Sequence, residues 1–229
     1  MVIFLFAFSS VRNSARKVSV PIIHFLGEEN LYITHENVSK LLIQNQSSVT
    51  NKPKEIIDLN ELETALNSNL MIAEAQVFIN VDGTLITQIK QKRPIARVST
   101  DASYYVDEQG TYMPLSTNFT ARVPLVTGDV KKNELKNVCE LAKKIQNDEF
   151  LKTHVIQIHL NENKTFDLKL RQNDFTIHLG TLNQLEKKIN NLKVFYQKGL
   201  KDKTLGNYSM LNLKFDNQVI CTKKVSNGN

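Results

Sequence analysis

A strictly alternating apolar pattern on both sides of one turn constrains the fold of this chain more than any other feature. Apolar residues occupy every second position from Ala75 to Val81, and Asp82-Gly83 follows as a hairpin turn signal. The alternation resumes over residues 85–89. A period of two places the apolar side chains of both strands on one face of a sheet. Other elements of the chain are therefore expected to cover that face.

Segments upstream of this hairpin supply the covering elements. Thr34 can cap a helix, and Asp58 with Glu61 has the spacing of a capping box at the start of another. The apolar stripes of these two helices are formed by Val38, Leu41 and Leu42, and by Leu59, Leu62 and Leu66. Residues 18–25 are β-branched and apolar, which indicates a strand. The order strand-helix-helix-strand-strand predicts a small α+β unit with two helices on one face of a three-stranded sheet.

Beyond Pro94 the pattern changes to short strands. They are expected at residues 95–98, 104–106, 111–113, 155–160, 166–170 and 175–179, with a closing hairpin of 209–215 and 218–222 around Asp216-Asn217. Two long amphipathic helices are expected at 134–146 and 182–200. The fold class is therefore α+β, with a small domain of β-α-α-β-β order followed by a mixed β domain that carries two long helices.

The charge is dispersed along the chain. The 29 Lys and Arg residues exceed the 23 Asp and Glu residues, which gives a net charge of +6. The densest basic groups, residues 90–93, 143–144 and 198–203, are flanked by acidic or apolar residues. A nucleic-acid interface needs a clustered basic patch. The sequence therefore argues against nucleic acid as a partner.

Two cysteines, Cys139 and Cys221, lie far apart in the sequence and form no CxxC pair. This spacing excludes a disulfide framework and a cysteine zinc site. Cys139 has apolar neighbours at helical spacing, so it is expected to be buried in a helix. A single bridge between the two cysteines stays open if the compartment is oxidising.

The chain begins with an apolar run, Met1–Phe8, and basic residues follow at Arg12, Arg16 and Lys17. As a helix the run would span roughly 12 Å, well short of the ~30 Å hydrocarbon core of a bilayer. Three interpretations compete: a signal peptide, a buried strand, and the second half of a transmembrane helix. A signal peptide is disfavoured, because no basic segment precedes the run and no A-x-A-like cleavage site follows it. We favour the third, because a core strand followed at once by residues 11–17 (VRNSARK) would be an awkward start. Residues 1–17 are therefore expected to be a membrane-anchor remnant with its juxtamembrane segment, although the basic flank argues weakly against export of the downstream chain.

One string has a catalytic appearance. Phe78–Leu85 (FINVDGTL) resembles the first motif of haloacid-dehalogenase-type phosphatases. The first acidic residue of that motif must be a carboxylate, because it attacks phosphorus. Asn80 stands in that place as a neutral amide, so a hairpin turn at Asp82-Gly83 is the favoured interpretation.

The histidines show no metal-binding spacing. None of the five pairs with another at i, i+4, and His154 and His159, five apart on one expected strand, point to opposite faces. No GxSxG, P-loop or GxGxxG string is present. We therefore expect no catalytic residue, no metal site, no cofactor and no small-molecule substrate.

Five features, taken in order, resemble the FtsQ/DivIB cell-division family. The unit over residues 18–93 looks like a POTRA domain, and Gln91–Ala96 (QKRPIA) resembles the string that ends it, with an amide where the family has an acidic residue. Tyr104–Gly110 (YYVDEQG) resembles the family's aromatic-Val/Ile-Asp-x-x-Gly turn. Val123–Gly128 (VPLVTG) resembles its lPll.G string, and Tyr208–Thr222 resembles its closing hairpin.

The resemblance implies an architecture and a location. It covers about residues 18–224 and implies a POTRA domain over 18–93, a β domain over 94–224 and a flexible tail over 225–229. Members of the family are bitopic inner-membrane proteins with a cytoplasmic N-terminus and most of their mass in the periplasm, at the division septum. They are non-enzymatic scaffolds of the divisome that bind the coiled-coil proteins FtsB and FtsL.

The resemblance also implies a binding site. In the family the partner docks along the C-terminal β-region and pairs with its last strand, where an edge offers a row of free N–H and C=O groups. The corresponding residues here are Tyr208, Leu211, Val219, Ile220, Cys221 and Thr222. The alternative for the site is that these residues only close the sheet. The alternative for the function is another single-POTRA envelope transport or assembly factor.

Overall fold

The computed structural model describes residues 17–27, 30–46, 53, 56–215 and 218–225. The expected anchor run Met1–Phe8, the turn residues Asp216-Asn217 and residues 226–229 of the expected tail lie outside them. The chain divides into two compact units, Met1–Lys92 with Ser116–Thr120, and Arg93–Leu115 with Ala121–Asn229. Within the described ranges, no helix is both long enough and apolar enough to cross a membrane.

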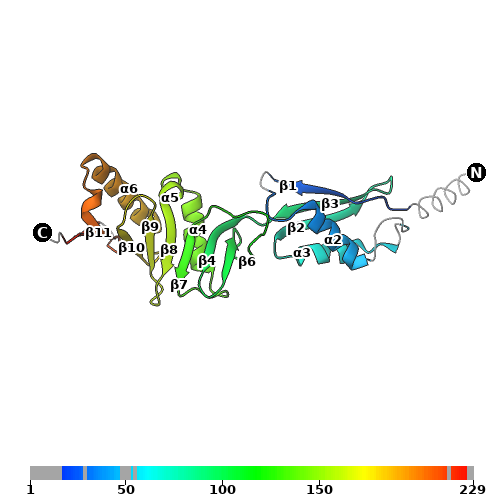
Figure 1. Cartoon of the computed structure of the whole chain (residues 1–229), viewed down its shortest axis with the longest axis horizontal. Coiled ribbons are helices and arrows are strands. Elements are labelled where there is room, and N and C mark those ends of the chain that lie inside the picture. The colour runs from blue at the N-terminus through cyan, green and yellow to red at the C-terminus, as the bar shows by residue number, and fades with distance from the viewer. Residues whose placement is uncertain (1–16, 28–29, 47–52, 54–55, 216–217, 226–229) are drawn as a thin grey trace, which may run out of the picture. The chain divides into compact units, whose positions relative to one another are not determined.

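In the first unit, two helices pack on one face of a three-stranded sheet (Figure 1). The elements follow the chain as β1 (Ile22–Leu26), α2 (His35–Gln46), α3 (Leu59–Asn67), β2 (Ile72–Ile79) and β3 (Leu85–Gln91). Strand β3 lies in the middle, parallel to β1 and antiparallel to β2. The predicted order of elements is confirmed. The first strand, however, begins after Pro21 rather than at Val18, because proline interrupts a strand ladder.

The helices of this unit begin where the sequence places their caps. The Asp58 carboxylate accepts a hydrogen bond from the Glu61 N–H at 3.0 Å, and α3 starts at Leu59, directly after Asp58. Its apolar stripe, Leu62 and Leu66, is completely buried against the alternating side chains of β2 and β3. The apolar residues that repeat every second position in the strands and every 3.6 positions in the helix therefore pack into one core.

The turn between β2 and β3 is a hairpin turn. The Gly83 N–H donates to the Asn80 carbonyl at 3.0 Å, and Gly83 has a φ of 90°, which side chains with a Cβ rarely adopt. The Asp82 carboxylate accepts from the Thr84 N–H at 3.0 Å. Asp82 thus closes a turn, as the favoured interpretation of FINVDGTL requires.

Side chains of α3 bind the outer edge of β2. Asn67 accepts from the Ala75 N–H at 2.8 Å and donates to the Ala75 carbonyl at 3.2 Å. The Glu63 carboxylate accepts from the Val77 N–H at 3.1 Å. These bonds occupy backbone groups that an added strand would need.

The second unit contains a nine-stranded sheet in the order β12-β11-β10-β9-β8-β7-β4-β5-β6. Its strands are β4 (Pro94–Ser99), β5 (Ser103–Asp107), β6 (Tyr112–Met113), β7 (Leu125–Gly128), β8 (Val155–Leu160), β9 (Phe166–Leu170), β10 (Thr176–Gly180), β11 (Tyr208–Asn212) and β12 (Ile220–Lys223). Its helices are α4 (Lys136–Gln146), α5 (Glu149–His154) and α6 (Leu185–Lys201), with a short 3₁₀ turn η2 (Leu205–Asn207). The predicted mixed β domain with two long helices is confirmed.

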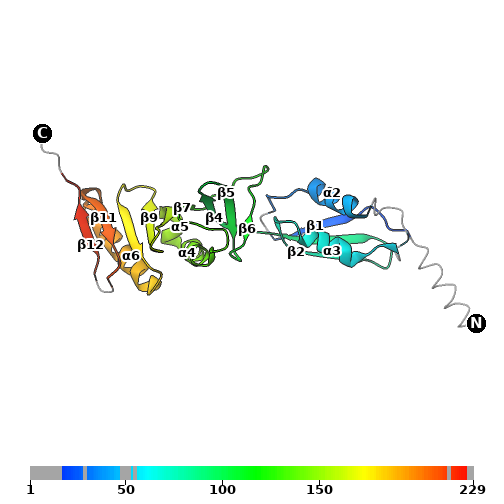
Figure 2. The ribbon, with the colours of Figure 1, turned by 90° about the horizontal axis from the view of Figure 1, so that it is seen from below.

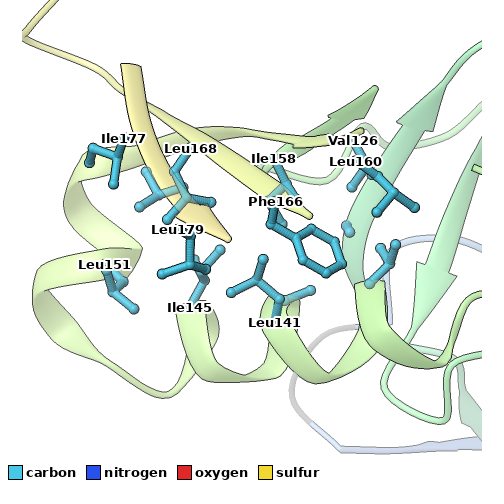
Figure 3. Close-up of a cluster of buried hydrophobic side chains, with 14 of the residues drawn as sticks. Val126, Leu141, Ile145, Leu151, Ile158, Leu160, Phe166, Leu168, Ile177 and Leu179 are labelled. Atoms are coloured by element: carbon cyan, nitrogen blue, oxygen red, sulfur yellow. The ribbon is translucent and has the colours of Figure 1, made fainter. Parts of the chain in front are cut away.

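The three α-helices lie on one face of this sheet (Figure 2). Figure 3 shows Leu141 and Ile145 of α4 facing Ile158, Phe166 and Leu168 from β8 and β9. These side chains are at most 1% exposed. Burial of so much apolar surface on one side fixes which residues of each strand point to the opposite, open face.

Two elements of the second unit differ from the sequence-based expectation. A short helix, α5, begins after Asp148, whose carboxylate accepts from the Leu151 N–H at 3.2 Å. His154 ends this helix, so the prediction that His154 and His159 share a strand was wrong. Strand β7 has only four residues and pairs in parallel with both β4 and β8. Such long-range parallel pairing leaves no local turn signal.

A buried glutamine joins the end of β3 to the segment before α2. The Gln91 side-chain oxygen accepts from the Tyr32 N–H at 2.9 Å and the Ile33 N–H at 3.1 Å. Its amide nitrogen donates to the Ile33 carbonyl at 2.9 Å. Gln91 is only 4% exposed. A carboxylate would lack this donor, so an amide suits this position better than an acid.

We predict that Gln91→Glu destabilises the first unit by about 3 kcal/mol at neutral pH, because it buries a charge and leaves the Ile33 carbonyl without its donor. Guanidinium unfolding followed by circular dichroism measures the change. The matched control is Gln88→Glu on the same strand, half-buried on the open face, with an expected effect within about 0.5 kcal/mol.

The cost of Gln91→Glu should depend on pH. Burial raises the folded-state pKa of the introduced carboxyl above its unfolded value of about 4.3. The variant is then closest to wild type below that value, where the neutral carboxyl can still donate, and loses stability as the pH rises. Equal losses for Gln91→Glu and Gln88→Glu at pH 7 would contradict this account.

Candidate protein-binding edge

Strand β12 forms one end of the nine-stranded sheet. It pairs antiparallel with β11, and its partners in register are Leu211 with Cys221 and Asn212 with Ile220. Among the described residues, no strand pairs with its outer side. The opposite end of the sheet is the two-residue strand β6, so β12 is the longer of the two terminal strands.

The hydrogen bonds of β11 establish which way its backbone groups point. The Leu213 N–H donates to the His178 carbonyl of β10 at 2.9 Å. Backbone groups alternate along a strand, so those of Leu211 also point to β10. The groups of Met210 and Asn212 consequently point the other way, toward β12.

The backbone groups of β12 follow from this alternation. Ile220 and Thr222 lie opposite Asn212 and Met210, so their N–H and C=O groups point into the sheet. The Lys224 N–H supports the same phase, because it donates to the Asn207 carbonyl at 2.8 Å. The N–H and C=O groups of Cys221 and the N–H of Lys223 therefore point outward from the sheet, whereas the Lys223 carbonyl accepts from the Ser209 hydroxyl of β11 at 3.5 Å.

The side chains of the edge divide between two faces. Leu211 is completely buried in the core, and the half-buried Cys221 packs against that core beside it. Ile220 and Thr222 are exposed on the other face. Met210 is also exposed there, opposite Thr222 and diagonal to Ile220. The open face beside the edge thus carries two exposed apolar side chains within reach of each other.

The structure separates the six residues that the sequence analysis singles out. Ile220, Cys221 and Thr222 lie on β12, and the half-buried Val219 directly precedes it. Tyr208 begins β11, and its ring contacts the Phe195 ring of α6 edge-on, with 5.6 Å between centroids. Leu211 supports the strand from within. Met210 was missed, although counting alternate positions from an apolar Leu211 identifies it. Lys223 was also missed, because its direction depends on the register between β11 and β12.

Both cysteines are free thiols, so the bridge that the sequence left open is not present. Burial raises the pKa of the Cys221 thiol. It also raises the pKa of the Cys139 thiol. A raised pKa keeps a thiol protonated and weakly nucleophilic, so neither cysteine has the environment of a catalytic nucleophile.

A hollow of about 940 Å³ on the open face is lined by His159, Asp167, His178 and Met210 among others. His159 Nδ1 hydrogen-bonds the Thr127 hydroxyl at 2.9 Å, and His178 Nδ1 is paired with the Asp167 carboxylate. These side chains stabilise one another across neighbouring strands. Within the described residues, no group of three His, Cys, Asp or Glu side chains is arranged to hold a metal ion.

Two of the strings noted in the sequence have structural roles. The Asp107 carboxylate accepts from the N–H groups of Gln109 at 3.0 Å and Thr111 at 2.7 Å, which closes the turn after β5. Gly128 ends β7 with a φ of 94°, and a Cβ there would lie 2.0 Å from the Leu160 carbonyl oxygen. Only glycine permits β7 to end this close to β8.

We predict that Gly128→Ala destabilises the second unit by about 3 kcal/mol, because it adds a backbone clash to a strained φ. Thermal unfolding monitored by circular dichroism measures the loss. Gly206→Ala is the matched control, since a Cβ at Gly206 meets nothing within 4 Å. A similar drop in both variants would show that the close approach at Gly128 is not what limits substitution.

Comparison with known families covers most of the chain. A family model described as FtsQ/DivIB, C-terminal related, matches residues 93–222, and a POTRA-like domain model matches residues 15–90. No curated protein matches the chain. The first match alone spans more than half of the 229 residues. The chain therefore belongs to the FtsQ/DivIB-like family of cell-division proteins, which are non-enzymatic scaffolds with protein partners at the division site.

Proposed function

We propose that this chain is a membrane-anchored, non-enzymatic scaffold of the bacterial divisome that binds FtsB- and FtsL-like coiled-coil proteins during septum formation. Residues 1–17 belong to a single-pass inner-membrane anchor and its juxtamembrane segment, with the N-terminus in the cytoplasm. Residues 18–93 form the POTRA domain, and residues 94–224 form the β domain, both in the periplasm. The partner adds a strand to β12.

The proposal is supported by the outward direction of the Cys221 N–H and C=O and of the Lys223 N–H. An edge strand points one N–H and one C=O outward at every second residue. An incoming strand that pairs with these groups gains register and affinity together. No cofactor or small-molecule substrate is part of the proposal.

Side chains beside the edge add specificity. Met210 and Ile220, each 43% exposed, give the partner an apolar contact on the open face. Apolar area removed from water contributes about 25 cal/mol per Å². The six residues Tyr208, Leu211, Val219, Ile220, Cys221 and Thr222 remain our proposed site. Leu211 and Tyr208 position the edge from the core side, and Ile220 and Thr222 face the partner.

The second candidate function is another single-POTRA envelope transport or assembly factor. The POTRA-like match over residues 15–90 supports it, but it assigns no role to the β domain. The match of residues 93–222 to the FtsQ/DivIB C-terminal region therefore favours the divisome scaffold.

We predict that Lys223→Pro lowers the affinity for the coiled-coil segment of the FtsB-like protein from the same genome by about tenfold. Proline removes one outward N–H, and the loss of one hydrogen bond of about 1–1.5 kcal/mol corresponds to that factor. Titration of the detergent-solubilised full chain measures the affinity. Proline at Ile220 or Thr222 would break a bond inside the sheet, so Lys223 is the informative position.

Lys223→Ala is the matched control, because it removes the same side chain and keeps the N–H. Its affinity should stay within about threefold of wild type if charge contributes only as an exposed rim contact. Equal affinities for Lys223→Pro and wild type would move the site away from β12. Absence of binding by wild type, alone or with the FtsL-like protein, would return the chain to the second candidate function.

A further inference from the structure

The open face of the first sheet is apolar at one end and polar at the other. Across β1, β3 and β2, the register places three rows side by side: Ile22, Ile86 and Phe78; then His24, Gln88 and Gln76; then Leu26, Lys90 and Glu74. Helices α2 and α3 pack on the opposite face. The first row is therefore an apolar band at the end of the sheet that carries the β2–β3 turn.

The apolar side chains continue beyond this row. Val81 in the β2–β3 turn is 87% exposed, and Val20, two residues before β1, is 70% exposed. Ile22 and Phe78 of the first row are also exposed. We call Val20, Ile22, Phe78, Val81 and Ile86 the apolar end. Transfer of exposed apolar side chains such as Val20 and Val81 from water into an apolar phase is favourable.

The apolar end lies where the N-terminal part of the chain arrives. The Ser19 N–H donates to the Gly83 carbonyl at 3.2 Å, so the backbone just after Lys17 is bonded to the β2–β3 turn. A Cβ at Gly83 would lie 3.1 Å from the Lys17 carbonyl oxygen. In the sequence, only residues 9–16 separate Lys17 from the apolar run Met1–Phe8. Eight extended residues reach at most about 30 Å.

The linking residues also carry a charge that suits a membrane surface. Arg12, Arg16 and Lys17 are the charged residues between the apolar run and Val18. Basic residues are attracted to anionic lipid headgroups within about a Debye length of the surface.

We propose that the apolar end rests on the surface of the bilayer that anchors the chain, with Val81 inserted among the lipid headgroups and the polar rows directed away from the membrane. This inference rests on the membrane anchoring of the proposed function. It adds an orientation: the β2–β3 turn of the POTRA domain faces the lipid, and the Leu26 end of the same sheet face does not.

Tryptophan fluorescence tests this orientation, because the chain has no native tryptophan. Val81→Trp places a single tryptophan on the apolar end of the sheet face, and Leu26→Trp places one on the opposite, polar end. The full-length variants are reconstituted into vesicles of phosphatidylethanolamine and phosphatidylglycerol, with and without brominated lipid. Flotation of the wild-type chain with the same vesicles measures anchoring separately.

We expect flotation of the wild type, a blue-shifted emission and at least twofold quenching by brominated lipid for Val81→Trp, and little quenching for Leu26→Trp. Flotation with an unquenched Val81→Trp would overturn the surface contact and leave the anchor in place. Equal quenching of both variants would overturn the orientation. Failure of the wild type to float would overturn the anchor and this inference together, while the strand-addition site would be judged by its own titration.

Discussion

The burial of Leu211 is the constraint on which the edge of the β domain depends. Leu211 points into the helix-covered core, and its partner in register, Cys221, packs beside it. Because side chains alternate along a strand, a slip of one residue would bring exposed residues such as Ile220 into the core and turn Cys221 out. The same alternation directs the backbone N–H groups of Cys221 and Lys223 outward. Hydrophobic packing inside the sheet thus determines which hydrogen-bonding groups the chain presents at its surface.

The two units differ in whether the outer backbone groups of an edge strand are hydrogen-bonded within the chain. In the first unit, Asn67 of α3 binds the outer N–H and C=O of Ala75, and Glu63 binds the outer N–H of Val77. In the second unit, the N–H and C=O of Cys221 and the N–H of Lys223 point away from β11. Unpaired edges invite association, and proteins commonly cover those they do not use. The contrast supports β12 rather than β2 as the position for an added strand.

Local sequence signals predicted the first unit well because each of its elements has one. The cap at Asp58, the alternation of β2 and β3 and the turn at Gly83 are local signals, because each involves residues that are close together in the sequence. The second unit was harder, since β7 and the β10–β11 pair join strands in parallel that are distant along the chain. The hairpin of β11 and β12 was visible as two apolar runs. The outward direction of Lys223 was not, because it follows from the phase of hydrogen bonds that β10 imposes on β11.

Buried polar groups mark the other limit of sequence reasoning. Gln91 looks like a surface residue between Lys90 and Lys92, and its bonds to Tyr32 and Ile33 span nearly sixty positions. Its donor and acceptor are both used, so neither an acid nor an apolar residue can replace it without leaving a buried backbone group unpaired. The Tyr32 carbonyl is held in turn by the Ser116 hydroxyl at 2.8 Å and by the Asn118 amide at 3.2 Å. The Gln91 amide therefore joins two stretches of the first unit, and the Tyr32 carbonyl joins a third, so an amide at position 91 is a requirement of this core.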